Sequence, residues 1–216
     1  GVCSGTTSCG SSSWGTSSCG SWSSGTVSAG TATGTKTLTA TASDASGVTQ
    51  VVFQLSPTGQ NNWTPVATDT EAPYSTSFAT TSVADGVYDF RAVATDPAGN
   101  PGTSVVPSRM IDNTGATGSI TSPTMGAIVS GTAAVTATAT DAGSGVSQIT
   151  FERSPAGQNA WTAISVADTT VPYSVNWTTT ALVDGNYDLR GVILDDAGNQ
   201  STTPVVTVVV RNRHTF

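Results

Sequence analysis

The chain of 216 residues has little of what most enzymes and nucleic-acid-binding proteins need. Charged residues make up only 10% of it and aromatic residues only 6%. The single histidine, His214, argues against histidine-based catalysis and histidine-ligated metals. The formal net charge of −7 makes nucleic acid and anionic membranes unfavourable partners.

Long apolar runs are also missing, and none approaches the ~20 residues that a membrane-spanning helix needs. We therefore expect no membrane insertion. Leu, Glu, Lys and Arg are scarce, whereas Thr and Val are abundant, which favours strands over helices. A surface that is hydrated through hydroxyl groups, with few charged side chains, is typical of secreted bacterial proteins. We therefore expect an extracellular or cell-surface location. The sequence begins at Gly1 without a signal peptide, which suggests a processed chain or a fragment.

Residues 1–24 form a leader rich in Gly, Ser, Thr and Cys, with the low complexity of a disordered segment. It holds all three cysteines of the chain, Cys3, Cys9 and Cys19. An odd number in a secreted protein allows at most one internal bridge and leaves a thiol that can pair with another chain. The sequence does not decide between these pairings.

The rest of the chain contains one unit twice. LTATASD at 38–44 returns as VTATATD at 135–141, and the segment 72–100 returns at 171–199. Each copy shows short runs that alternate apolar and polar residues, separated by turn residues, as expected of half-buried strands. The offset between the copies is 97 residues for the first segment (38 to 135) and 99 for the second (72 to 171). A repeat of this length corresponds to a whole sandwich domain. We place the domains at 25–112 and 113–216, and the first strand of the first copy is weak or supplied from elsewhere.

The strings ITSPTMGAIVSGTAAVTATATD (120–141) and DGNYDLRGVILDDAGN (184–199) resemble the bacterial Ig-like repeats of large secreted and surface proteins. The resemblance covers both copies. It implies an all-β protein of two tandem immunoglobulin-like β-sandwiches preceded by a Gly/Ser/Cys-rich low-complexity segment. It implies little about function, because such modules serve as spacers, adhesin arms, enzyme appendages and fibre subunits.

Acidic residues gather where the loops of such sandwiches meet. Given the resemblance, the loops after the second and sixth strands of the second copy should converge near the linker and near one turn of the first copy. Carboxylates and carbonyls from loops suit Ca²⁺, which takes 6–8 oxygen ligands. The predicted calcium ligands are Asp85, Asp112, Asn113, Asp141, Asp195 and Asp196. The alternative is that these are ordinary turn residues.

Several aromatic residues have structural explanations. Tyr88 and Tyr187 each follow an Asp-Gly-x turn, the position of a tyrosine corner, in which the hydroxyl bonds to nearby backbone. We expect Trp63, Trp161 and Trp177 to cover the sandwich cores. The alternative for these tryptophans is an exposed row that binds glycan.

Catalysis finds no support, because no serine can pair with a histidine in a folded unit and the carboxylates recur in both copies. We therefore expect a non-enzymatic extracellular structural protein, a subunit of a self-assembling surface fibre whose leader contacts a neighbouring subunit. Its partner would be further copies of itself. The alternative is a spacer, adhesin or carbohydrate-binding segment of a larger secreted protein, with a glycan or a cell surface as partner.

Overall fold

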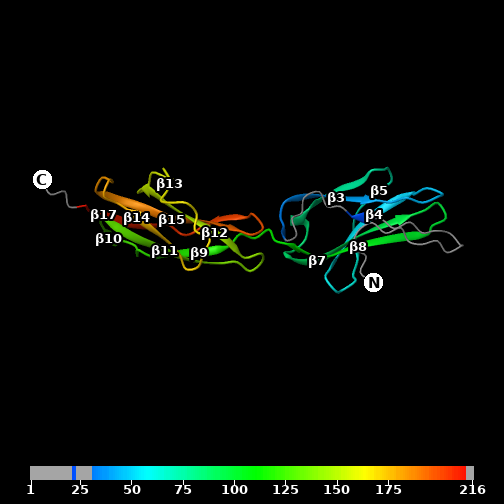
Figure 1. Cartoon of the computed structure of the whole chain (residues 1–216), viewed down its shortest axis with the longest axis horizontal. Coiled ribbons are helices and arrows are strands. Elements are labelled where there is room, and N and C mark those ends of the chain that lie inside the picture. The colour runs from blue at the N-terminus through cyan, green and yellow to red at the C-terminus, as the bar shows by residue number, and fades with distance from the viewer. Residues whose placement is uncertain (1–20, 23–30, 213–216) are drawn as a thin grey trace. The chain divides into compact units, whose positions relative to one another are not determined.

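The computed structural model describes residues 21–22 and 31–212. The chain divides into unit 1, Gly1–Asn113, and unit 2, Thr114–Phe216. Each unit is a sandwich of two β-sheets, shown in Figure 1. Cys3, Cys9 and Cys19 lie outside the described residues, so their pairing stays a prediction.

Unit 1 has a smaller and a larger sheet. In the smaller sheet, β3 (Thr35–Thr41) pairs on either side with β1 (Ser21–Trp22) and β6 (Tyr74–Ala79). The larger sheet has the order β2-β8-β7-β4-β5. Its strands are β2 (Thr31–Ala32), β8 (Pro101–Ile111), β7 (Gly86–Thr95), β4 (Gln50–Pro57) and β5 (Thr64–Asp69). A 3₁₀ turn, η1 (Thr80–Ser82), joins β6 to β7.

Unit 2 repeats this plan. In its smaller sheet, β11 (Thr132–Thr140) lies between β9 (Thr117–Ser122) and β14 (Tyr173–Thr178). The larger sheet has the order β10-β17-β15-β12-β13, and β16 also pairs with β15. Its strands are β10 (Ile128–Val129), β17 (Val206–Val210), β15 (Gly185–Asp195), β12 (Val146–Pro155), β13 (Thr162–Ala163) and β16 (Gln200–Thr202).

The described part of the first strand of unit 1 is two residues long, and it comes from this chain. Ser21 pairs with Thr41 and Trp22 with Ala40. The corresponding strand of unit 2, β9, has six residues and places half-buried Ile120 against the core. In both units the chain then crosses to the larger sheet, where β2 pairs in parallel with β8 and β10 in parallel with β17.

The cores follow the alternation that the sequence predicts. In β4, Val51 and Phe53 are fully buried, and in β12 Ile149 and Phe151 are fully buried. In each core, two aromatic rings pack edge to face. In unit 1 these are Phe78 and Phe90, with ring centroids 5.6 Å apart, and in unit 2 they are Trp177 and Tyr187, at 6.1 Å. Each sandwich therefore has a contiguous hydrophobic core of its own.

We define the N-terminal pole of each unit by its loops. In unit 1 it is the end with the β3–β4 and β7–β8 loops. In unit 2 it is the end with the β11–β12 and β15–β16 loops. The C-terminal pole is the opposite end, with the β6–β7 or β14–β15 turn and the last residues of the unit. Because the strands of each sheet run back and forth, alternate loops fall at the same pole.

Candidate functional site

The carboxylates at the N-terminal poles shape the loops that carry them. Asp141 accepts backbone hydrogen bonds from Gly143 at 2.9 Å and from Gly145 at 2.8 Å. Asp44, its counterpart in unit 1, accepts a hydrogen bond from the backbone of Ser46 at 2.8 Å. Side chains of Asp commonly stabilise turns in this way.

Asp195 and Asp96 do the same in the second loop of each pole. Asp195 accepts one hydrogen bond from the backbone N–H of Asn199 at 2.7 Å and one from its side-chain amide at 2.8 Å. Asp96 and Asn100 make the same two bonds. The bond from the Asn100 side chain, with that from its backbone, lowers the pKa of the Asp96 carboxyl below its ordinary value.

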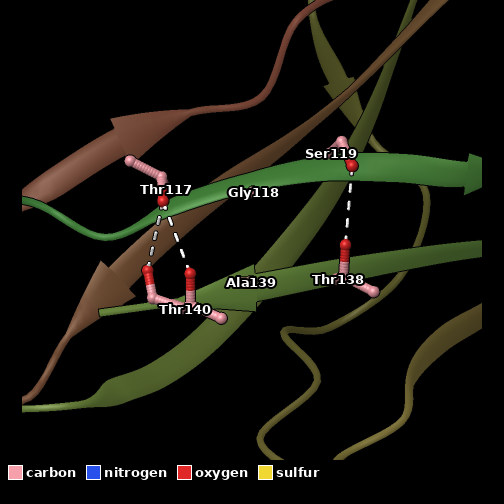
Figure 2. Close-up of a pocket in the computed structure, with 6 residues that line it drawn as sticks. All are labelled: Thr117, Gly118, Ser119, Thr138, Ala139 and Thr140. Carbon is pink, nitrogen blue, oxygen red and sulfur yellow. Dashed lines mark hydrogen bonds between the residues drawn. The ribbon is translucent and has the colours of Figure 1, made fainter. Parts of the chain in front are cut away.

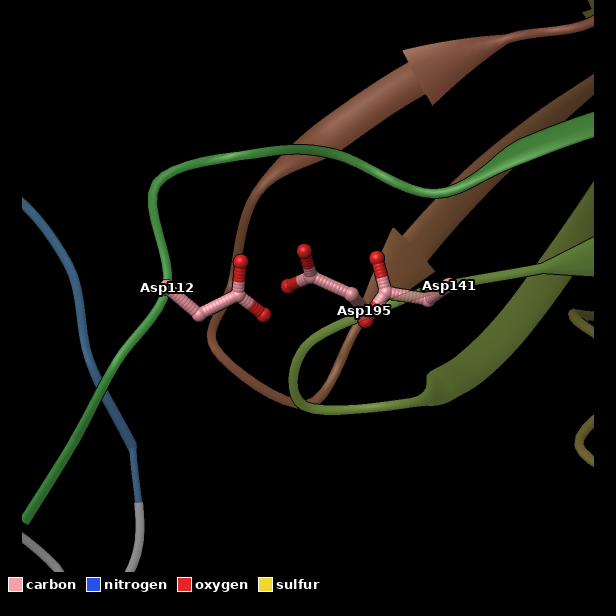
Figure 3. Close-up of side chains that lie close together, drawn as sticks. All are labelled: Asp112, Asp141 and Asp195. Carbon is pink, nitrogen blue, oxygen red and sulfur yellow. The ribbon is translucent and has the colours of Figure 1, made fainter. Parts of the chain in front are cut away.

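Unit 2 brings two of the predicted calcium ligands together. The nearest carboxylate oxygens of Asp141 and Asp195 lie within 4.8 Å of each other, and Figure 3 shows the two side chains side by side. Asp196 is exposed in the same loop. Hard oxygen donors of this kind suit Ca²⁺. Figure 3 also draws Asp112, the last residue but one of unit 1, whose backbone N–H donates to Ala32 at 3.1 Å.

The other two predicted ligands, Asp85 and Asn113, lie at the C-terminal pole of unit 1 and are hydrogen-bonded to each other. Asp85 accepts hydrogen bonds from the backbone N–H of Asn113 at 2.9 Å and from its side-chain amide at 3.0 Å. The side-chain oxygen of Asn113 in turn accepts a bond from the hydroxyl of fully buried Thr80. That hydroxyl also donates to Gly34, at 2.8 Å. These bonds fasten the end of the unit to its first strands.

Unit 2 has a similar network, which sequence reasoning missed; its asparagine side-chain amide donates to backbone carbonyls, where that of Asn113 donates to Asp85. Asn212 donates to the carbonyl of Thr179 at 2.7 Å and accepts from its hydroxyl at 3.0 Å. Gly131 also donates to Asn212, while Asp184 accepts from the Asn212 backbone N–H at 2.7 Å. The repeat of Thr, Asp and Asn at the same spacing in both copies was the available signal. We call this network, centred on Asn113 or Asn212, the terminal asparagine network.

Tyr88 in β7 and Tyr187 in β15 make equivalent hydrogen bonds. The hydroxyl of Tyr88 donates to the carbonyl of Ala84 at 3.0 Å, and that of Tyr187 to the carbonyl of Val183 at 3.1 Å. Each bond reaches back four residues, over the turn that precedes the strand. The tyrosines therefore hold the turns next to the terminal asparagine networks.

The expectation that all three repeat-unit tryptophans cover the cores was wrong for two of them. Trp177 is buried, but Trp63 and Trp161 are half-buried and lie against arginines on the outer face of the larger sheet. The guanidinium carbon of Arg91 lies 4.2 Å from the Trp63 ring centroid, and that of Arg190 lies 4.1 Å from the Trp161 ring centroid. The β4–β5 and β12–β13 connections lead each tryptophan to this outer face.

An arginine above each indole covers one face of the ring that a sugar would need. Each arginine is itself held from the side by the neighbouring strand. Arg91 donates to the Gln54 side chain at 2.6 Å, and Arg190 makes a salt bridge with Glu152 at 2.7 Å. Stacking of this kind is a cation–π contact that stabilises the sheet surface. This geometry is less suited to glycan stacking than a bare aromatic row.

The outer face of the β9–β11 pair is covered with hydroxyls. Figure 2 shows Thr117 directed toward Thr140 and Ser119 toward Thr138, each at 3.5 Å. A shallow depression of about 280 Å³ lies here. Its lining residues are Thr117, Gly118, Ser119, Thr138, Ala139 and Thr140. None of these six carries an acid, a base or an activated nucleophile, so the depression offers no catalytic group.

Two further carboxylates, also missed from the sequence, lie at sheet edges. Among the described strands, none pairs with the outer edge of β6 or β14. Asp69 accepts a bond from the backbone N–H of Ser75 at 2.8 Å, and Asp168 accepts one from Ser174 at 2.8 Å. Both bonds lower the pKa of the carboxyl group from its ordinary value, as do bonds from Glu71 and Thr170.

The described residues include no helix that is long and apolar enough to cross a membrane. No curated protein matches the chain. Among solved structures, it is similar to the fibronectin(III)-like modules of Clostridium thermocellum CbhA, at 24% identity and a TM-score of 0.51, covering 91% of this chain and 98% of that one. It is also similar to a marsupial T cell receptor, at 13% identity and a TM-score of 0.51, covering 92% of this chain and 75% of that one.

Likeness at these identities shows the fold and leaves the function open. The family model described as the bacterial Ig domain matches residues 21–92 and 117–190. Together the two segments span more than half of the chain, one in each unit. The all-β fold, the tandem repeat and the predicted resemblance are thereby confirmed. The chain belongs to the bacterial Ig domain family.

Proposed function

We propose that the chain is a non-enzymatic structural protein of the cell exterior, a subunit of a self-assembling surface fibre. The observation that carries this proposal is the terminal asparagine network, which is present in both units. In each unit it ties the last described residue, Asn113 or Asn212, to the first strands and to the β6–β7 or β14–β15 turn. A module fastened where the chain leaves it suits a protein that transmits force along its length.

The leader supplies the contact between subunits in this proposal. It contains Cys3, Cys9 and Cys19, and residues 25–216 contain no cysteine. Three cysteines leave one without an internal partner, and in an oxidising compartment that thiol can form a bridge to a neighbouring chain. Subunits joined in this way would be held by covalent bonds and by contacts between folded units.

Electron microscopy of the purified protein, with and without a thiol reductant, tests the proposal. We expect filaments or ladders, and we expect reduction to shorten or dissolve them. A variant with all three cysteines changed to serine is the matched control, because reductant should then have no further effect. Isolated particles of single-chain mass at every protein concentration would contradict assembly.

The second candidate is a spacer or adhesin segment of a larger secreted protein. Membership of the bacterial Ig domain family favours it, as does the similarity to a chain made of fibronectin(III)-like modules. In that case the purified chain would remain single under oxidising and reducing conditions. The arginines above Trp63 and Trp161 argue against the carbohydrate-binding version of this candidate. Glycan binding that survives the double change Trp63→Ala, Trp161→Ala would show that these indoles are not its site.

A further inference from the structure

The C-terminal poles of the two units differ although their folds agree. The β2–β8 and β10–β17 pairings align Thr31 with Ile128, and the repeat aligns Ala84 with Val183. In unit 2 both aligned side chains are large and apolar, and they are exposed, Ile128 at 61% and Val183 at 80%. Isolated exposed apolar residues are ordinary, but two at one pole form a surface that water solvates poorly.

The charge at the pole changes as well. Where unit 1 has Asp112 before its terminal asparagine, unit 2 has Arg211 before Asn212. Arg211 is exposed, and it makes no salt bridge with another described residue. The nearby carboxylate of Asp184 already accepts the Asn212 backbone N–H. Unit 2 therefore presents an available guanidinium beside apolar side chains.

Two of these residues, Ile128 and Arg211, border a hollow. It has a volume of about 720 Å³. The remaining lining residues are Ser130, Gly131, Thr180, Asp184 and Asn212. The hollow thus combines an apolar side chain, polar groups, one carboxylate and one guanidinium, and its guanidinium can pair with an acid on a protruding loop.

The chain itself has loops of that composition at the N-terminal pole of unit 1. The first follows β3 and contains Asp44 and half-buried Val48; the second follows β7 and contains Asp96 with exposed Pro97. Neither the segment 42–49 nor the segment 95–100 contains a lysine or an arginine. Unit 2 has acidic loops at its own N-terminal pole as well, but in the chain that pole directly follows unit 1, whose last residue is Asn113.

We propose that the C-terminal pole of unit 2, formed by Ile128, Val183 and Arg211, binds the N-terminal pole of unit 1 in a second copy of the chain. The guanidinium of Arg211 meets the carboxylates of Asp44 and Asp96, and the two apolar side chains cover the loops that carry them. This inference rests on the proposed fibre function, to which it adds a head-to-tail contact.

The test transfers the unit 1 pole onto unit 2. The variant Ile128→Thr, Val183→Ala, Arg211→Asp contains only residues that unit 1 has at the same positions, so the fold should tolerate it. Circular dichroism during heating checks that it does. In sedimentation velocity, we expect the variant to need at least about tenfold more protein than wild type to assemble, which corresponds to about 1.4 kcal/mol. Lys36→Glu in unit 1 makes the charge more negative by the same two units as Arg211→Asp and is the matched control.

A photo-crosslinking residue at position 183 locates the contact directly. We expect adducts between chains on segments 42–49 or 95–100 of unit 1, identified by mass spectrometry. Assemblies of wild type and of the triple variant that form equally well, or adducts on other segments, would overturn this inference and leave the fibre proposal standing. Wild-type protein that never assembles would overturn both.

Discussion

Units 1 and 2 have similar hydrogen-bond patterns, but different side chains occupy equivalent positions in their cores. The clearest case is the middle of β7 and β15, where unit 1 has Ala92 and unit 2 has Gly191. A Cβ atom on Gly191 would lie 3.1 Å from the Ile149 side chain and 3.2 Å from the methyl group of Thr203. The equivalent residues of unit 1 are smaller, Val51 and Ser104.

The difference teaches that packing is adjusted across a set of neighbouring residues and not position by position. Unit 2 has larger neighbours around a residue without a side chain, and unit 1 has smaller neighbours around an alanine. Both arrangements bury the strand pair, β4 with β7 or β12 with β15, to the same depth. Close packing of protein interiors makes such compensation necessary.

The largest effect should come from the feature that the two units share. Asn212→Ala removes side-chain bonds with Gly131 and Thr179 and leaves buried polar groups without partners. We expect unit 2 to lose about 3 kcal/mol of unfolding free energy, because each such group costs about 1–3 kcal/mol. Calorimetry of the whole chain should show one transition moving to lower temperature while the other stays. An unchanged thermogram would show that the network does not stabilise the unit.

Gly191→Ala tests the compensated packing. The added methyl group meets Ile149 and Thr203 at contacts that are too short, so we expect a loss of about 2 kcal/mol. Thr203→Ser, as in unit 1, removes one of the opposing methyl groups and keeps the hydroxyl that binds the Gly191 N–H at 2.9 Å. The double variant should recover part of the loss. Purely additive losses in urea unfolding would refute the compensation.

Calcium addition tests the paired carboxylates of unit 2. If Asp141 and Asp195 bind Ca²⁺, the unfolding free energy of unit 2 should rise by about 1.4 kcal/mol at ten times the Kd. Differential scanning calorimetry with CaCl₂, and with MgCl₂ for comparison, measures the rise. Asp141→Asn should abolish it, whereas Asp44→Asn in unit 1 is the matched control. No shift at millimolar Ca²⁺ would leave these residues as turn formers alone.

Lowering the pH should reveal how much Asp69 and Asp168, the carboxylates at the sheet edges, contribute to stability. The folded pKa values of Asp69 and Asp168 lie below the ordinary value of 3.8, chiefly because of the bonds from Ser75 and Ser174. A lowered folded pKa contributes stability above pH 3.8, and this contribution is lost as the pH falls through the folded values. Urea unfolding at a series of pH values should therefore show a slope below pH 4 that is smaller in the Asp69→Ala, Asp168→Ala variant. Parallel slopes would contradict the assignment.

The smallest effect is expected at the outer arginines. Glu152→Gln copies the Gln54 of unit 1 and replaces a partly exposed salt bridge by a hydrogen bond. Surface ion pairs contribute about 0–1 kcal/mol, so we expect a loss below about 0.5 kcal/mol. Arg190→Ala should cost more, because it also uncovers Trp161. Tryptophan fluorescence before and after each change reports the exposure of that indole.

Sequence patterns predicted the elements that depend on near neighbours. Alternation at 51–55 and 187–193 predicted buried strands, and the internal repeat predicted two sandwiches. The outward position of Trp161 was not predictable in the same way, because it depends on how the β12–β13 connection folds over Arg190. The terminal asparagine network was missed for a related reason. Asn212 and Thr179 lie 33 residues apart, and no pattern within one copy links an asparagine to a threonine over that distance.

The edge carboxylates have a consequence for how the chain reaches its folded state. Two copies of one unit on one chain can exchange strands while they fold, since a strand of either copy fits the sheet of the other. An open edge strand such as β6 or β14 is where such an exchange would begin. Asp69 and Asp168 already occupy the outward amide of the second residue of these strands. A strand arriving from the other copy would have to displace a charged acceptor before it could pair, so we expect each carboxylate to disfavour exchange between the two repeats.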